Sequence, residues 1–284
     1  MKTRIGAPML ALFITPAVLA AQPSGFSDTF IGYRYSSHFS DPGKKQDIAK
    51  NIVQLGHVST YALGQQFANL DVFKSDHNDP EKDSNRGATE VYLTYRNQLQ
   101  YGRIFAQPLA FGPVKDVALT MGLDWNTKNN AFESRKRMLV IGPTFKFKLP
   151  VGFVDLSLYY AREWNHCGLA SCDLPGNHSS LLFDPYYQLN LAWGIPFTVA
   201  GVATKFQGFY NYNTEKGKDY RNQPTADEQL MRTSLMFDVG QLAGARKNRF
   251  WVGPGYEYWR HKFGNRTGYG IDVDALSINM EWHL

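Results

Sequence analysis

The last nine residues of the chain alternate strictly between apolar and polar side chains. The apolar members are Leu276, Ile278, Met280, Trp282 and Leu284, and one polar residue stands between each pair. Successive side chains of a β-strand point to opposite faces, so this segment has one apolar and one polar face. Such a strand at the carboxyl end is typical of outer-membrane β-barrels, whose outer face meets lipid while the inner face is hydrated.

Other segments show the same alternation or are rich in β-forming residues. The clearest are 90–96, 116–125, 139–147, 154–160 and 187–193, and the weaker ones are 30–35, 51–59, 67–73, 199–212, 230–239 and 250–259. With the terminal segment they make twelve, an even number as in bacterial single-chain barrels. We therefore predict an all-β fold, a 12-stranded antiparallel transmembrane β-barrel of the bacterial outer membrane. The alternative is a soluble β-sandwich or lipocalin-like barrel, which the long strands and the charges on their polar faces disfavour.

The connections between these strands are expected to be long on one side of the membrane and short on the other. Residues 149–152 and 194–197 are short, turn-like segments, whereas 74–88, 165–182 and 213–226 are long and polar. The long segments are predicted to face outward, where their acidic residues would meet lipopolysaccharide. The segment 97–114 is too long for a simple turn, and we expect an ordered excursion beneath the barrel.

The amino-terminal residues 1–20 are typical of a secretory signal peptide. Lys2 and Arg4 precede a short apolar run, and small residues stand before Ala21. A membrane anchor is the alternative, but the run is shorter than a spanning helix needs. We therefore expect one barrel domain over 21–284, inserted in the outer membrane by the barrel-assembly machinery.

The overall composition favours a membrane over nucleic acid as the binding partner. Aromatic residues make up 14% of the chain, and barrels use aromatics in the girdles at both membrane interfaces. The net charge of +5 falls to +3 without Lys2 and Arg4, and the basic residues are not clustered, which argues against nucleic acid. Cys167 and Cys172 are close together in an exported chain, so we predict a local disulfide in an outward loop.

With the apolar faces outward, the polar faces supply a mixed-charge lumen. Its predicted charges are Asp71, Glu90, Asp116, Asp124, Asp155, Asp238, Glu257, Glu281, Arg34, Arg96, Lys146, Lys205 and Arg232. The residues that we predict to line the pore and meet a solute are Phe67, Asn69, Asp71, Phe73, Tyr92, Arg96, Asp124, Asp155, Tyr159, Arg232, Glu257, Trp259 and Glu281. Mixed charges and flat aromatic faces suit a small neutral polar solute. Salt bridges and packing that hold the wall are the alternative interpretation.

Signals for catalysis are weak. Some outer-membrane barrels are lipid hydrolases and need a serine activated by histidine and a third polar group. His178, Ser179 and Ser180 are adjacent, but only Asp184 follows as a third group. The acidic segment 76–83 does not match a calcium loop, because Pro80 stands at a position where that pattern needs Asp or Asn. We expect no enzyme activity, no cofactor and no metal.

The segment Leu109-Ala110-Phe111-Gly112-Pro113-Val114-Lys115-Asp116 resembles a segment of the nucleoside-specific channel-forming outer-membrane proteins (Tsx) and the related OmpK proteins. In that family the pattern is Leu-Ser-Phe-Gly-Pro-x-Lys-Glu. The run from Phe67 to Phe73 is similar to the family's Tyr-Ala-Asp-x-x-Val-Phe strand, and Leu123-Asp124-Trp125 resembles its Glu-Trp-Asp region. The similarity is clearest over 60–165.

This resemblance implies a monomeric twelve-stranded barrel that passes nucleosides and serves incidentally as a bacteriophage receptor. It also places Asn69, Asp71 and Phe73 on a pore-lining strand, although Asn69 replaces an Asp. The family normally ends on Phe, whereas this chain ends on Leu284. The alternative function is a surface structural protein or receptor without specific transport.

Overall fold

The computed structural model describes residues 25–244 and 246–284. Over these residues the chain is almost entirely β-structure. The strands are β1 (Ser27–Phe39), β2 (Ile48–Tyr61), β3 (Gly64–Ser75), β4 (Thr89–Gln100), β5 (Val114–Lys128), β6 (Arg137–Phe147), β7 (Phe153–His166), β8 (Ser180–Leu182), β9 (Tyr186–Val199), β10 (Val202–Asn213), β11 (Glu228–Asp238), β12 (Phe250–Arg260) and β13 (Val273–His283). The predicted signal peptide lies outside the described residues.

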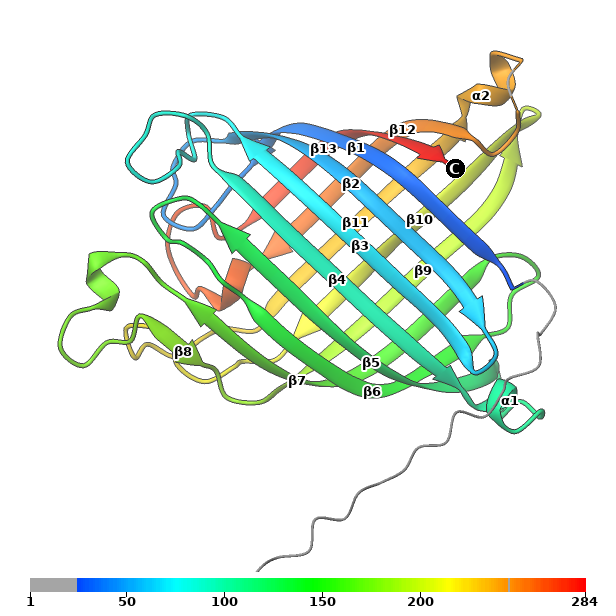
Figure 1. Cartoon of the computed structure of the whole chain (residues 1–284), viewed down its shortest axis with the longest axis horizontal. Helices are drawn as coiled ribbons and strands as arrows, with labels where there is room; N and C mark the ends of the chain where they lie inside the picture. The colour runs from blue at the N-terminus through cyan, green and yellow to red at the C-terminus, as the bar shows by residue number, and fades with distance from the viewer. Residues whose placement is uncertain (1–24, 245) are drawn as a thin grey trace, which may run out of the picture.

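Twelve long strands form one closed antiparallel barrel (Figure 1). Each long strand pairs with the next along the chain, β7 with β9 in place of the three-residue β8. The barrel closes where β1 pairs with β13, with Tyr33 opposite Met280. Closure leaves no unpaired edge, which is how a β-sheet can cross a bilayer with every backbone group satisfied. The predicted fold class is confirmed.

The two ends of the barrel differ in their connections, as Figure 1 shows. We call the end on the left of that view, with the long connections, the loop end; the opposite one, near the carboxyl terminus, is the turn end. The 3₁₀ helices η1 (Ala170–Cys172) and η2 (Lys262–Gly264) are at the loop end, and the short α-helices α1 (Tyr101–Ile104) and α2 (Val239–Leu242) are at the turn end. Because long loops face outward in such barrels, the loop end is assigned to the cell exterior.

One predicted turn is wrong. Residues 194–197 continue β9, and the chain reverses at Ala200 and Gly201. Both residues have positive φ, 49° and 81°, the conformation that two-residue hairpin turns need. Pro196 within the strand made the segment look like a turn, but its missing N–H does not stop the register with Lys205.

The outer surface of the barrel carries an apolar band. Its exposed side chains include Ile31, Val53, Leu55, Val72, Leu119, Met121, Leu139, Ile141, Leu158, Leu189, Leu276 and Ile278. These residues come from β1, β2, β3, β5, β6, β7, β9 and β13 and alternate with inward polar residues, so the band is the surface that meets hydrocarbon. No helix among the described residues is long and apolar enough to span a membrane.

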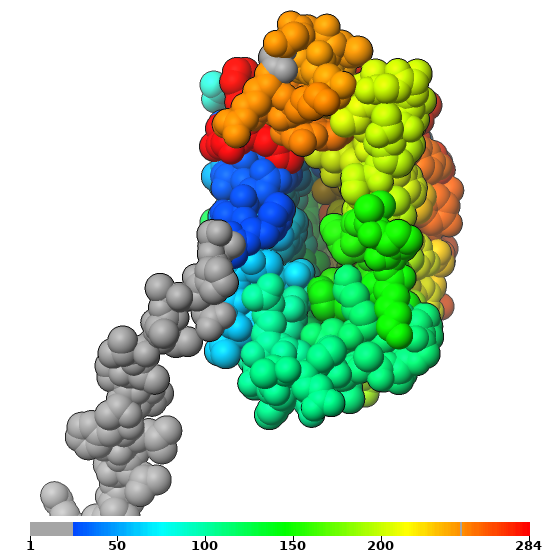
Figure 2. Space-filling view, turned by 90° about the vertical axis from the view of Figure 1, so that its right-hand side faces the viewer, coloured from blue at the N-terminus to red at the C-terminus, as the bar shows by residue number. Residues whose placement is uncertain are grey.

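Two acids on the inner face, Asp116 and Asp238, also anchor the connections at the turn end. Asp116 accepts hydrogen bonds from the backbone N–H groups of Gly102 and Leu109, and so holds the excursion between β4 and β5. Asp238 is fully buried and accepts from the backbone N–H groups of Gln241 and Asn248, closing the excursion that contains α2. Figure 2 views this end and shows it hollowed between the blue strand β1 and the green to yellow segments opposite.

The outward loops pack on one another at the loop end. Cys167 and Cys172 form a disulfide, and both are buried with Phe183 and Tyr220. Phe132 from the β5–β6 connection packs on this group and meets the Tyr220 ring edge-on. The cluster joins three connections and gives the loop end an apolar core of its own.

Candidate functional site: the charged lumen

Contacts between distant strands show which faces point inward. Arg232 on β11 lies 3.4 Å from Asp71 on β3, although four strands separate β3 from β11 along the wall. Such a contact must run through the interior. Alternation from Asp71 and Arg232 then places the other predicted pore-lining side chains on the inner face as well.

Four residues form what we call the central arginine cluster: Arg34, Asp71, Arg232 and Glu257. Arg232 donates to Glu257 at 3.0 Å and approaches Asp71 at 3.4 Å. Arg34 lies 3.8 Å from Asp71 and 4.0 Å from Glu257. Two positive and two negative charges balance, and all four side chains come from strands, so the strand register fixes their positions.

A second charged group lies on the wall formed by β4, β5 and β7. Arg96 donates to Asp124 at 2.7 Å, and the Tyr92 hydroxyl donates to the same carboxylate at 2.9 Å. The Arg96 guanidinium also lies 6.0 Å from the centre of the Tyr159 ring. Tyr92 is paired in register with Asp71, which brings this group next to the central arginine cluster.

Hydrogen-bonding groups without charge continue the inner wall. Asn69 accepts from Gln54 and donates to Asp71. Thr120, Thr144 and Ser157 form a buried chain of hydroxyls across β5, β6 and β7, with oxygen separations of 2.5 and 2.7 Å.

Charges near the turn end are also paired. Lys146 donates to Asp155 at 2.6 Å, and Lys205 donates to Glu281 at 2.5 Å. His283 lies 3.3 Å from Glu281. The predicted acids Asp155 and Glu281 are thus each paired with a lysine. The charges near the turn end therefore do not form a ring of one sign.

The predicted lumen aromatics fall into two groups. Phe73 and Trp259 pack against a buried apolar cluster near the loop end, formed by Phe39, Ile52, Val273 and Ala275. Tyr159 is 2% exposed and belongs to a second cluster with Met138, Val140, Ala161 and Tyr186. Phe67 keeps 38% of its surface exposed, and Tyr92 is half-buried. Phe67 and Tyr92 therefore offer more ring surface than Tyr159.

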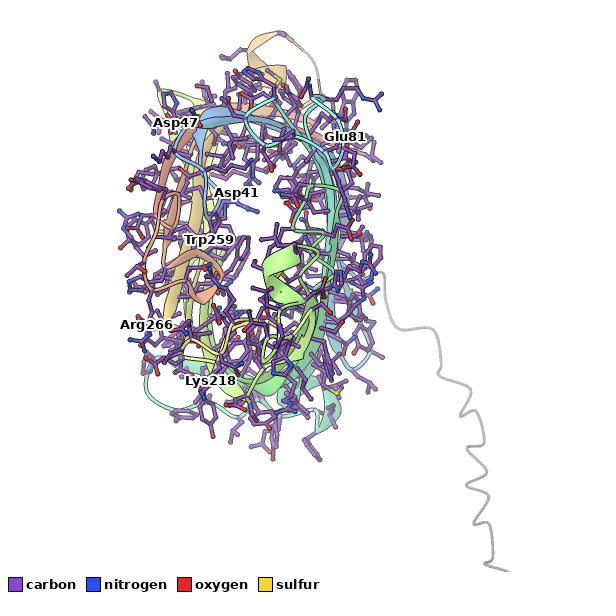
Figure 3. The ribbon with its side chains drawn as sticks, turned by 90° about the vertical axis from the view of Figure 1, so that its left-hand side faces the viewer. Asp41, Asp47, Glu81, Lys218, Trp259 and Arg266 are labelled. Carbon is purple, nitrogen blue, oxygen red and sulfur yellow. A yellow bond between two sulfur atoms is a disulfide. The ribbon has the colours of Figure 1, made fainter. Side chains whose placement is uncertain are left out.

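The loop end holds a charged group that the sequence did not predict, which we call the Asp41 cluster. Asp41 from the β1–β2 connection accepts from three lysines: Lys50 at 3.0 Å, Lys128 at 2.6 Å and Lys262 at 2.8 Å. Burial alone would raise the pKa of Asp41, but the three ammonium groups together hold it well below its usual value. Figure 3 shows Asp41 and Trp259 inside the ring of strands, while Asp47, Glu81 and Arg266 lie at its rim.

A further buried group joins two outward connections to β7. Glu163 lies 2.8 Å from Lys216 and 3.5 Å from Lys136, and it accepts from the Tyr186 hydroxyl. Burial would lower the pKa of Lys136, but the charge of Glu163 raises it well above its usual value. This pairing ties the loops to the wall in the same way that Asp41 does.

The hydrolase candidates do not assemble around His178. The Ser180 hydroxyl lies 3.5 Å from Nδ1 of His166, whose Nε2 is 3.9 Å from Glu133. Glu133 is engaged by Lys82 at 2.7 Å, and the serine is on the histidine nitrogen opposite to the one that accepts the serine proton in the serine-hydrolase triad. Among residues 25–244 and 246–284, no group of three or more His, Cys, Asp or Glu side chains could hold a metal ion.

A closed barrel, apolar outside and charged inside, defines a transmembrane β-barrel of the bacterial outer membrane. Similar solved structures are barrels of that membrane. The KdgM porin has a TM-score of 0.43 at 8% identity, covering 89% of this chain and 98% of that one. The translocator domain of autotransporter NalP from Neisseria meningitidis has a TM-score of 0.47 at 10% identity, covering 93% of this chain and 90% of that one. The COG4313 outer membrane channel from Pseudomonas putida F1 has a TM-score of 0.45 at 10% identity, covering 95% of this chain and 100% of that one.

These scores are too low to carry an argument about a solute. No protein-family model matches the chain, and no curated protein matches it. The resemblance to the nucleoside channels therefore stays a prediction that depends on residues 67–73, 109–116 and 123–125.

Proposed function

We propose that this protein is a passive channel for small polar solutes, with nucleosides as the favoured class. The observation that carries the proposal is the balance of charge in the lumen. In the central arginine cluster and in the Arg96–Asp124 pair, each positive charge has an acidic neighbour within 4.0 Å. A lumen of paired charges has no ring of one sign, and such rings are what make pores strongly ion-selective.

The wall next to these charges supports binding of a flat polar molecule. Tyr92 presents a half-buried ring beside Asp71 and Asp124, and Asn69 lies on the neighbouring strand. Stacking of a base on an aromatic ring contributes about 1–3 kcal/mol, which is weak enough to let the solute leave. Amide and carboxylate groups nearby can accept the hydrogen bonds of the base and the ribose.

Solute flux in a defined membrane tests the proposal. Refolded protein is placed in planar bilayers, and conductance is measured with and without adenosine. We expect measurable channels that show little preference between K⁺ and Cl⁻ and that adenosine partly blocks. Ribose and inosine provide the comparison, because a stacking site binds inosine but not ribose. Channels blocked equally by ribose and adenosine would reject the nucleoside assignment.

A silent bilayer would favour the other reading, a surface receptor without transport. The ordered loop end is the observation behind that reading, since its connections pack around the disulfide of Cys167 and Cys172. A refolding control is therefore needed: the barrel must show the shift in electrophoretic mobility on heating that folded outer-membrane barrels show before silence is interpreted.

A further inference from the structure

The Asp41 cluster combines one acid from a loop with two bases on strands and a third in the connection between β12 and β13. Lys50 is on β2, Lys128 is on β5, and Lys262 follows β12 in η2. Asp41 alone comes from the β1–β2 connection, residues 40–47. All four side chains are at most 10% exposed, so the carboxylate is inserted among the lysines and not merely near them.

Two of the lysines depend on Asp41 for their charge pairing. Within the part of the chain that the structure describes, Lys50 and Lys262 have Asp41 as their one carboxylate partner. Lys128 also meets Asp79 at 2.8 Å and Glu90 at 3.8 Å. Withdrawal of Asp41 would therefore leave two buried ammonium groups without a counter-charge, which is unfavourable unless water or another anion enters in its place.

The loop that carries Asp41 is otherwise held by contacts to neighbouring connections and not by strand pairing. The backbone N–H of Gly43 donates to the carbonyl of Tyr269, and Lys262 donates to the carbonyl of Ser40 at 2.7 Å. Asn78 donates to the carbonyl of Asp47 at 2.8 Å, and the Lys45 ammonium lies 4.7 Å from the centre of the Tyr269 ring. The pairing of β1 with β2 already shifts register between Ser36 and Phe39, just before this loop. The loop can therefore lift without breaking the regular ladder below Ser36.

An aromatic face lies beside the lysines. The Lys262 ammonium lies 4.3 Å from the centre of the Trp259 ring, on the inner side of β12. Flat aromatic rings stack on the apolar face of a sugar ring while polar neighbours bind its hydroxyl and acid groups. The neighbourhood of Asp41 thus offers both groups that a sugar acid would need.

We propose that Lys50, Lys128 and Lys262 form a binding site for the carboxylate of a small solute such as a sugar acid, and that Asp41 occupies this site when no solute is present. The solute carboxylate replaces Asp41 at the outer mouth, and the loop lifts as it does so. The inference depends on the proposed channel function for its purpose, but the site itself is independent of conduction.

Binding in detergent solution tests the site without requiring a conducting membrane. Calorimetric titration with glucuronate, at low chloride, is compared with titration with glucose. Removing a carboxylate that competes for the site raises the apparent affinity by the reciprocal of the fraction of time the site was free, so a site free about one tenth of the time gains about tenfold. We expect Asp41→Asn to bind glucuronate about tenfold more tightly than the wild type, and neither protein to bind glucose measurably.

Two variants separate this site from a general gain in positive charge. Asp79→Asn removes a different partner of Lys128 and leaves Asp41 in place, so it should show no such gain. Adding Lys262→Gln to Asp41→Asn should abolish the gain. Equal affinity of Asp41→Asn and wild type for glucuronate, or equal binding of glucose and glucuronate, would overturn the proposal.

A folding failure of Asp41→Asn would still leave a decisive measurement. The mobility shift on heating identifies such a failure, and Lys262→Gln in the wild-type background then replaces it. That variant should weaken glucuronate binding about tenfold, and unchanged binding would overturn the proposal. Glucuronate binding together with a silent bilayer would support the site and reject the channel, so the two failures are distinguishable.

Discussion

The central arginine cluster and the Asp41 cluster achieve the same charge balance in different ways. Arg34, Asp71, Arg232 and Glu257 all stand on strands, and hydrogen-bonded register sets their separation. Asp41 instead reaches its three lysines from a loop. In both clusters the charged groups are buried and lie within 4.0 Å of their partners, so these distances alone do not distinguish the clusters.

The difference lies in what happens when a pair is broken. A strand residue cannot retreat without disturbing two ladders, so a lost partner in the central arginine cluster leaves a charge where it stands. The Asp41 loop can move, and water or an anion can enter behind it. The central arginine cluster is therefore expected to stabilise the barrel, whereas the Asp41 cluster is expected to open when its loop moves.

The largest effect is expected from Asp71→Asn, which leaves Arg34 and Arg232 to share Glu257. Removing one partner of a buried ion pair costs about 3–5 kcal/mol of unfolding free energy. Urea unfolding in lipid, followed by tryptophan fluorescence, measures this loss. Asp274→Asn is the control, since Asp274 pairs with Arg260 on the outside with half its side chain exposed, and exposed pairs contribute about 0–1 kcal/mol. Equal losses in the two variants would contradict the structural role of the central arginine cluster.

Asp41→Asn should lower the free energy of unfolding by less, about 1–3 kcal/mol, because movement of the loop lets water hydrate the lysines. The pKa of Asp41 is held below its usual value of 3.8, so its carboxylate stabilises the fold above that pH and the contribution disappears as the pH falls through the lowered value. We therefore expect a constant difference between wild type and variant from pH 8 to about pH 4.5, and convergence in stronger acid.

Unfolding at a series of pH values measures that difference. Other buried carboxylates titrate in both proteins, so the comparison of the two curves isolates Asp41. A difference that shrank between pH 8 and pH 6 would show that another group is responsible.

The strands and their inner faces could be predicted because alternation is a local property. Asp71, Glu257 and Arg232 were assigned to the lumen from parity alone, although their pairing depends on strand order. The Asp41 cluster could not be found in this way. Lys50 and Lys128 lie just beyond the predicted strand ends, and Asp41 and Lys262 lie outside the strands, where no periodicity links them. Parity also placed Asp116 and Asp238 on the inner face, but it does not show that their carboxylates accept hydrogen bonds from the backbone of a neighbouring turn.

A smaller effect is expected on solute binding at the strand-built wall. Tyr92→Ala removes the ring beside Asp71 and should raise the adenosine concentration for half-block about fivefold, corresponding to about 1 kcal/mol of lost stacking. Tyr92→Phe is the matched control, because it keeps the ring and loses only the hydrogen bond to Asp124. Single-channel recording gives both values. A Phe variant as defective as the Ala variant would show that the hydroxyl, and not stacking, holds the solute.

The smallest effect on the barrel is expected from the double substitution Cys167→Ser and Cys172→Ser, and it tests whether loops and wall are separate units. The disulfide closes a short segment within one outward loop, packed on Phe183 and Tyr220. Local units open with free energies below that of global unfolding, so the loss should appear as faster proteolysis between 167 and 185 while barrel unfolding changes by less than about 1 kcal/mol. If barrel stability instead fell as far as in Asp71→Asn, the loop end and the strands would unfold as one unit. The Asp41 loop could then not lift on its own, and the contrast between the two charged clusters would be lost.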